Sequence, residues 1–517
     1  MDLTWIGGRK VDHPLADARH ARDLVSTLPL GDPATALRQI TEWLESLNQT
    51  EGLKINRRFE TVDLLDGAAN GPQKKLSHDY LFTPREQKYH ENRLWNAAYG
   101  YWKELGDAYN LCISEYESGS SGTTAIRRSL PVIVARALRA LTLQLKWELL
   151  RYGPVERRIW SEIARLYRLA EQAGMADSAI AIYPGEHELT TPQREFLKAV
   201  VLAASSPDGL PPLRLEIAER AVAHFAHGFR LSTRPEGCTH CFDLALSKPP
   251  VRLVKGPNPT ETLRFFAASE GLAELGQLAA RISRSGVIPA EANFDGGHEK
   301  EAVTAVLNHL VQAWSDQPPT RSAERRQTAG CITVVPGLNE ILDTLEPRSE
   351  DDLDFSCQPS TESWIVDNAS DYGYGAIIPA RKGSWIRIGA LIGVKNETSE
   401  YWTIGLIRRI ACDEYRQRRV GIQLLARIAI PIKIARIPET TSLNFTDHEP
   451  QQAAVLLTAH PDHQEEIGVV LRNGALNGCD GLEMAVREKS YLLTPTRIIE
   501  GGEDFDWATF KMAQLSA

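Results

Sequence analysis

The spacing of hydrophobic residues changes once along the chain, near residue 315. Before that point apolar side chains recur every three or four positions, which is typical of helices that bury one face. In the segment 33–47, for example, Leu37, Ile40 and Leu44 share a face, and Asp32 precedes Pro33 as a plausible N-cap. The same period predicts further helices over 84–116, 125–152, 155–174, 192–205, 212–229, 261–282 and 299–314. Helix pairs joined by short breaks, without a fixed-period repeat, predict a bundle or an irregular α-solenoid.

After residue 315 the apolar positions move toward alternation, which is the pattern of half-buried strands. Candidate strands cover 331–335, 363–367, 375–379, 385–394, 401–411 and 419–426, with a helical insert at 337–345. Short strands separated by turn residues predict an antiparallel barrel or sandwich. A last block of candidate strands at 453–457, 467–471, 482–486 and 491–499 predicts a second small β-unit packed on the first. We therefore expect an α+β multidomain protein with a helical domain (1–314), a β-barrel domain (315–435) and a C-terminal β extension (436–517).

Composition narrows the classes of partner. The chain has 517 residues and a formal net charge of −9, which argues against a general affinity for nucleic-acid polymers or acidic membranes. Any anionic ligand must then meet a local cationic cluster. The seven scattered cysteines do not form a disulfide pattern and fit a reducing compartment. Because there is no signal-peptide core and no run of about 20 apolar residues, we expect a cytoplasmic protein without membrane insertion.

Two polar motifs accompany the change in period. Arg321 and Arg325 lie four apart in a lead-in that follows a proline-broken segment, with Arg326 beside them. Further on, Asn368 and Ser370 follow the candidate strand 363–367. Residues two apart in a strand point to the same side, so the carboxamide and the hydroxyl are expected to act together.

Gly373 completes the spacing Asn-x-Ser-x-x-Gly. We expect it to adopt a positive φ, which lets the next strand start and leaves room for a flat ligand. Each motif alone is weak evidence, because arginine pairs are frequent and Asn, Ser and Gly are common in turns. Their order and their β context make the combination more specific.

The two motifs, together with the strand-like segments 386–393, 402–409 and 418–425, resemble the PilZ family, over about residues 321–428. The resemblance implies a small β-barrel that binds the bacterial messenger cyclic di-GMP. Arg321 and Arg325 would then hold guanine and phosphate, while Asn368 and Ser370 would recognise guanine. Arg326 would either replace Arg325 as the second clamp or face solvent.

Two features depart from the family pattern. Asn368 stands where many members have aspartate, so it can accept a hydrogen bond from guanine but brings no charge. The insert 337–354 also lengthens the distance along the chain between Arg325 and Asn368.

A second candidate site lies in the helical part, where Cys238, His240 and Cys241 follow His224 and His227. One Cys-x-x-Cys without a partner pair is thin evidence for zinc, so we expect no metal, no cofactor and no catalytic residues there. No signature of an enzyme that makes or degrades the messenger is present. The sequence thus predicts a non-enzymatic receptor whose helical region contacts a downstream protein partner. The alternatives are a scaffold whose barrel binds no nucleotide, or an enzyme built on the Cys238 neighbourhood.

Overall fold

The computed structural model describes residues 13–84, 86–184, 188–254, 258–292, 294, 297–317, 323–345, 361–379, 385–438, 451–457, 466–477, 479–486 and 489–515. The chain divides into two compact units, Met1–Pro319 and Thr320–Ala517. Arg321 and the acidic segment 350–354 lie outside the described residues. The first unit is helical and the second consists of β-barrels, which confirms the predicted α+β class.

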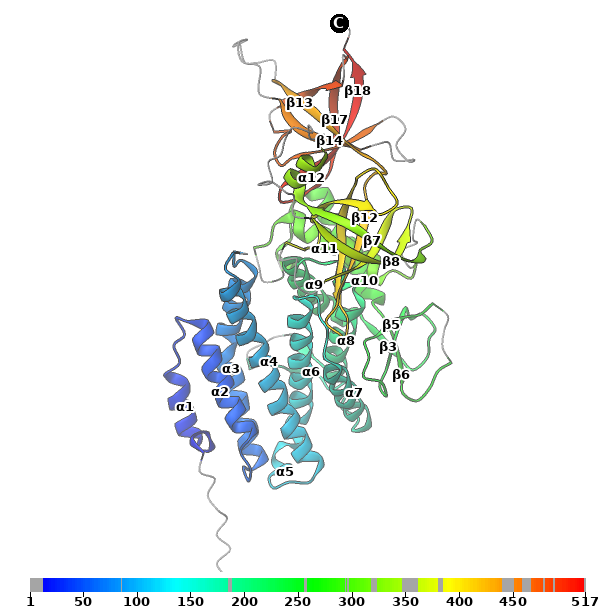
Figure 1. The fold of residues 1–517 in the computed structure, drawn as a ribbon. Helices are drawn as coiled ribbons and strands as arrows, with labels where there is room; N and C mark the ends of the chain where they lie inside the picture. Colours follow the sequence, from blue (N-terminus) through cyan, green and yellow to red (C-terminus); the bar gives the residue numbers. More distant parts are fainter. Residues whose placement is uncertain are drawn as a thin grey trace, which may run out of the picture. The chain divides into compact units, whose positions relative to one another are not determined.

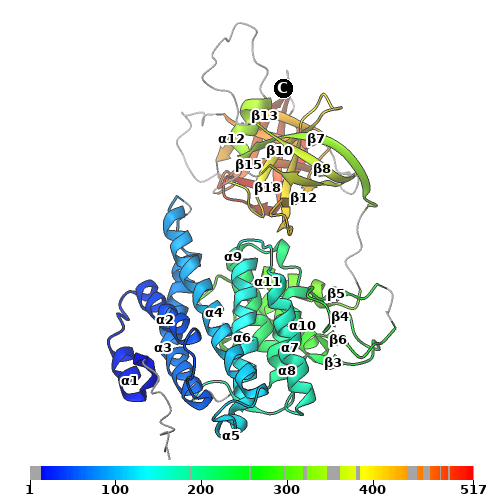
Figure 2. The ribbon, with the colours of Figure 1, turned by 60° about the horizontal axis from the view of Figure 1, so that its bottom comes forward.

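The first unit is built mainly from helices (Figures 1 and 2). They are α1 Ala18–Ser26, α2 Pro33–Asn48, α3 Ile55–Leu81, α4 Lys88–Glu117, α5 Thr123–Ile126, α6 Leu130–Leu149, α7 Arg157–Gln172, α8 Pro192–Ala204, α9 Pro212–Phe225, α10 Ser269–Ser285 and α11 Lys300–Trp314. Helix α6 is the centre of the unit, because most of its residues are buried and it packs against α4, α7 and α8. Pro131 lies in its first turn, where a missing backbone N–H costs nothing.

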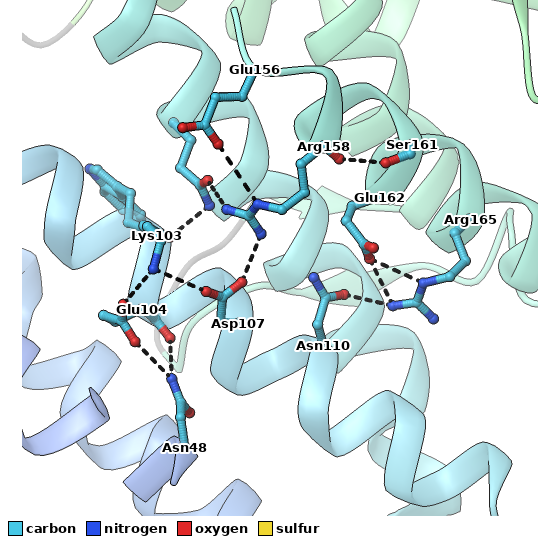
Figure 3. A network of polar contacts seen from close by, with 12 residues as sticks. Asn48, Lys103, Glu104, Asp107, Asn110, Glu156, Arg158, Ser161, Glu162 and Arg165 are labelled. Atoms are coloured by element: carbon cyan, nitrogen blue, oxygen red, sulfur yellow. Dashed lines mark hydrogen bonds and ion pairs between the residues drawn. The ribbon is translucent and has the colours of Figure 1, made fainter. Parts of the chain in front are cut away.

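Polar contacts join the outer faces of three of these helices (Figure 3). Arg158 of α7 donates to Asp107 of α4 at 2.8 Å, and Asn48 of α2 donates to Glu104 of α4 at 3.2 Å. Lys103 lies 2.7 Å from Glu104 and 3.5 Å from Asp107. These side chains are partly exposed, so we interpret the network as polar contacts that hold the helices together and not as a binding site.

Two differences from the predicted helices have identifiable causes. Helix α3 was not predicted, because Gly67, Gly71 and Pro72 interrupt its apolar period. The helix expected over 261–282 begins only at Ser269, and the strand β6 (Leu263–Ala267) occupies its first part. That strand pairs with β3 (Arg230–Ser232) and β4 (His240–Asp243), and β5 (Val251–Arg252) completes the sheet in the order β3-β6-β4-β5. Pairing with distant strands has overridden the local helical pattern.

The second unit starts with a closed six-stranded antiparallel barrel. Its strands are β7 Arg326–Pro336, β8 Glu362–Ser370, β9 Gly373–Ile378, β10 Leu391–Asn396, β11 Thr403–Cys412 and β12 Arg418–Leu424, arranged in the order β10-β11-β12-β9-β8-β7. The predicted insert forms the helix α12 (Gly337–Leu345). The antiparallel barrel predicted for this region is thus confirmed, although β10 begins at Leu391 and not at Trp385.

The C-terminal β-unit is a second closed barrel, larger than the four strands that the sequence predicted. It contains β13 Ala429–Pro438, β14 Gln452–Leu457, β15 Ile467–Arg472, β16 Cys479–Val486, β17 Lys489–Gly501 and β18 Phe505–Gln514. Strand β13 spans the boundary predicted at 436. Its strand order is β13-β14-β15-β18-β17-β16. When the strands are counted along the chain, both barrels pair the first strand with the second, the second with the third, the third with the sixth, the sixth with the fifth, the fifth with the fourth and the fourth with the first. The two barrels therefore share one topology.

The two barrels pack on each other within this unit. Helix α12 contributes Leu338 and Ile341 to a core that also contains Val455 and Phe505 of the second barrel. Arg408 of β11 forms a two-pronged ion pair with Glu500 of β17, with both N–O distances at 2.7 Å. A bidentate guanidinium–carboxylate pair fixes orientation as well as distance.

Candidate functional site

The polar residues of β8 lie on the outer face of the first barrel because of an irregularity at Asp367. Trp364 and Val366 are buried inside the barrel. The register then shifts between Val366 and Asn368, so Asn368 pairs with Gly375 and Ser370 pairs with Gly373. One extra residue in a strand reverses which side the following side chains take. Asn368 and Ser370 therefore share a face, as their spacing predicted, and that face is the outer one.

A row of paired residues crosses four strands at this point. Asn368 of β8 is opposite Gly375 of β9, Gly375 is opposite Gly421 of β12, and Gly421 is opposite Arg409 of β11. The two glycines in the middle make room for the side chains of Asn368 and Arg409, which lie over them, and Gly375 is buried. A Cβ on Gly375 would lie 2.6 Å from Nδ2 of Asn368, and one on Gly421 would lie 3.4 Å from Cβ of Arg409. We call this row the glycine floor; it follows the curve of the barrel and has the carboxamide of Asn368 at one end and the guanidinium-bearing side chain of Arg409 at the other.

The arginine lead-in reaches this floor. Arg325 donates from Nη1 to Oδ1 of Asn368 at 2.9 Å, and Asn368 donates from Nδ2 to Asp367 at 3.0 Å. Arg326 opens β7 and pairs with Ala369. The structure therefore brings Arg325 to Asn368 at one end of the floor, whereas Arg326, opposite Ala369, takes the other face of the strand pair. Arg321 lies outside the described residues.

The role expected for Gly373 is wrong in its detail. The glycines with positive φ in the described chain do not include Gly373, which is the first residue of β9. A Cβ at this position would lie 2.1 Å from the carbonyl oxygen of Ile422 in β12. The glycine is required because two backbones approach closely, and not because the chain turns with a left-handed conformation.

Further charges border the floor. Arg419 lies 3.6 Å from Asp367 and 3.4 Å from Asp413. The backbone N–H of Gln417 donates a hydrogen bond to the carboxylate of Asp413 and holds the pKa of Asp413 below its usual value. Arg408 donates to Gln423 at 2.6 Å. Arg409 and the two central glycines carry no signal of a site in the sequence, because strand alternation alone does not reveal which residues share a row.

The Cys238–Cys241 neighbourhood is packed as structure. His240 is buried, stacks on Phe266 with ring centroids 5.5 Å apart, and is hydrogen-bonded to Thr239 at 2.9 Å. Burial, with a smaller effect of Arg252, lowers the pKa of His240 to about 4. Within the described part of the chain, no group of three His, Cys, Asp or Glu side chains is placed to hold a metal ion.

A cavity of about 760 Å³ lies among α3, α6, α8 and α9 of the helical unit. Its wall includes the buried Lys146, whose ammonium group lies 2.6 Å from Glu216 and 2.9 Å from Glu219. Arg220 pairs with Glu216 at 2.8 Å. The lining also includes Lys74, Arg139, Arg194 and Lys198 beside Glu188 and Glu195, so Lys and Arg side chains outnumber carboxylates along the cavity wall.

Comparison with known families gives two matches. Residues 19–236 match the N-terminal domain of the cyclic-di-GMP receptor FimW, and residues 346–431 match the middle PilZ domain of the same receptor. The second match contains Asn368, Ser370, Arg409 and Gly421, whereas β7 and Arg325 precede it. No curated protein matches the chain. Among the described residues, no helix is both long and apolar enough to cross a bilayer.

Proposed function

Because residues 346–431 are a PilZ domain of a cyclic di-GMP receptor family, we propose that this protein is a receptor that binds cyclic di-GMP on the outer face of its first barrel. The observation that carries the site is the hydrogen bond between Arg325 and Asn368. It supports the proposal because the cationic lead-in and the strand amide come from distant parts of the sequence and already lie together. The matches are to receptor domains, and we propose that the protein acts by binding and not by catalysis.

The ligand offers two phosphates and two guanines, and the residues at this end of the floor suit one half of it. The guanidinium groups of Arg321 and Arg325 would grip a phosphate or the O6/N7 edge of a guanine with paired hydrogen bonds. Asn368 and Ser370 would bond the remaining edge of that guanine. Arg326, at the start of β7, would either take the place of Arg325 as the second clamp or face solvent, and its exposure and its pairing with Ala369 favour solvent.

Binding would change the lead-in. A guanine that bonds Asn368 replaces the present Arg325–Asn368 contact, and Arg325 then turns to the ligand. We propose that this capture changes the conformation of the lead-in within 315–329 and resets the angle between the helical unit and the barrel. Such a change requires that the ligand bind one arrangement more tightly than the other. The helical unit would carry the result to a protein partner.

Titration calorimetry with cyclic di-GMP tests the site. Arg325→Ala and Ser370→Ala are expected to abolish or severely weaken binding while circular dichroism stays unchanged. Arg497→Ala serves as the matched control, because Arg497 is an exposed strand arginine of the second barrel. Wild-type affinity in both site variants would reject this site, and absence of heat with the wild type would favour a scaffold that binds no nucleotide.

A further inference from the structure

The far end of the glycine floor bears an arginine that the proposed site leaves unassigned. We infer that Arg409 recognises the second guanine of the bound dinucleotide and thereby sets the preference for a ligand with two guanines. This inference rests on the proposed function, since it concerns the same face of the same barrel.

The position of Arg409 depends on a second strand irregularity. In β11 the register shifts between Ile407 and Arg409, so Arg408 is an extra residue. Ile407 and Ile410 are both buried inside the barrel, and simple alternation from Ile407 would turn Arg409 inward. The extra residue places Arg409 on the outer face, where it is exposed.

The two irregularities are arranged around the same row. Asn368 directly follows the extra residue of β8, and Arg409 directly follows the extra residue of β11. Both residues are paired to the central glycines, so they lie at opposite ends of one row, three strands apart around the barrel. Bulges are concentrated next to binding sites, where they redirect side chains.

Arg408 is held in place by the second barrel. Its guanidinium group is bonded to both carboxylate oxygens of Glu500 and to Gln423. These bonds anchor the extra residue and therefore fix the side on which Arg409 emerges. The aliphatic stem of Arg409 lies beside Gly421, with Cγ at 3.8 Å and Cδ at 4.0 Å from the position of a Cβ there. The stem of Arg409 is therefore supported by the backbone of Gly421.

The chemistry favours a guanine as the target. With one guanine at Asn368 and Ser370, the rest of the ligand would extend along the row toward Arg409, whose stem lies over Gly421. An arginine fork matches the O6 and N7 acceptors of guanine, whereas adenine presents an amino donor in place of O6. Arg409 would thus discriminate between the two purines at the second position.

The test compares cyclic di-GMP with 3′,3′-cyclic GMP–AMP, which keeps both phosphates and one guanine. The wild type is expected to prefer cyclic di-GMP by about 10- to 100-fold, the usual size of one bidentate base contact. In Arg409→Ala that preference is expected to fall close to one, through weaker binding of cyclic di-GMP. Arg409→Lys is expected to lose the preference as well, because an ammonium group has no fork. Arg497→Ala is the control and should retain the wild-type ratio.

Two outcomes overturn the inference while leaving the proposed function intact. An unchanged ratio in Arg409→Ala and Arg409→Lys would mean that Arg409 does not read the ligand, and an equal loss for both dinucleotides would indicate a phosphate contact. If the wild type binds neither dinucleotide, the proposed function itself fails, and the inference fails with it.

Discussion

At the scale of single residues, the site depends on small groups that keep others in place. Gly375 is the clearest case, because its missing side chain makes room for the carboxamide of Asn368. The sequence motif named Asn368 and Ser370 but not the glycine beneath them, since Gly375 belongs to another strand and becomes a neighbour only through register.

We therefore predict that Gly375→Ala weakens binding of cyclic di-GMP by at least about tenfold without unfolding the barrel. A methyl group 2.6 Å from Nδ2 and 2.7 Å from Oδ1 must push Asn368 aside, which costs of the order of one good base contact. Calorimetry gives the affinity. Gly330→Ala is the control, because Gly330 also lies in a strand of this barrel but has open space around it. Equal affinities for the two variants would contradict the role given to Gly375.

His240 gives a pH prediction for the helical unit. Its pKa falls to about 4 in the folded protein, below the unfolded value of about 6.5. Between these values the unfolded chain binds more protons, so the free energy of unfolding decreases as the pH falls. From pH 7 to pH 5 the loss due to this residue is expected to be about 2 kcal/mol.

Denaturant unfolding of wild type and His240→Gln at both pH values measures this effect. The variant should lose less stability on acidification than the wild type, whereas His20→Gln, at an exposed helix position, should behave as the wild type does. A wild-type pH dependence retained in His240→Gln would show that other groups cause it.

At the scale of elements, the sequence predicted types better than boundaries or sides. The helices with uninterrupted apolar faces, such as α2 and α6, and the alternating strands of the first barrel were predicted near their true positions. Helix α3 was missed because of its glycines and Pro72, and β6 because its partners are distant in sequence. The two strand bulges could not be predicted, since an extra residue is defined only against a partner strand. Because of these bulges Asn368 and Arg409 face outward, so the glycine floor could not be predicted from the sequence.

The contact between α6 and α9 yields a prediction about stability. Lys146 is buried and balances Glu216 and Glu219, so Lys146→Met leaves carboxylates in the interior without their cation. Removing one member of a buried ion pair typically costs 3–5 kcal/mol, so we expect a loss of about that size in denaturant unfolding. Arg38→Met removes an ion pair to Glu42 with both side chains exposed, and should cost about 0.5 kcal/mol or less. Losses of similar size in the two variants would show that Arg220 is sufficient to compensate Glu216.

At the scale of the whole molecule, the two compact units predict separate responses to ligand. Scanning calorimetry should resolve two transitions, and cyclic di-GMP should raise only the one that belongs to the barrels. At a ligand concentration of about 100 times Kd the expected stabilisation is about 2.7 kcal/mol. Ser370→Ala should show both transitions but no shift. A shift of the helical transition alone would place the ligand in the first unit.

The shared topology of the two barrels has a consequence for assembly. Only the first barrel carries the Asn-x-Ser-x-x-Gly sequence, and the second supplies Glu500 to support it. Because the second barrel is part of the same polypeptide, it is always present in equal amount, and its concentration near the first barrel does not change when the cell makes more or less of the protein. The contact between the two barrels should therefore persist at any dilution. A contact with a barrel of a second molecule would be lost at low protein concentration.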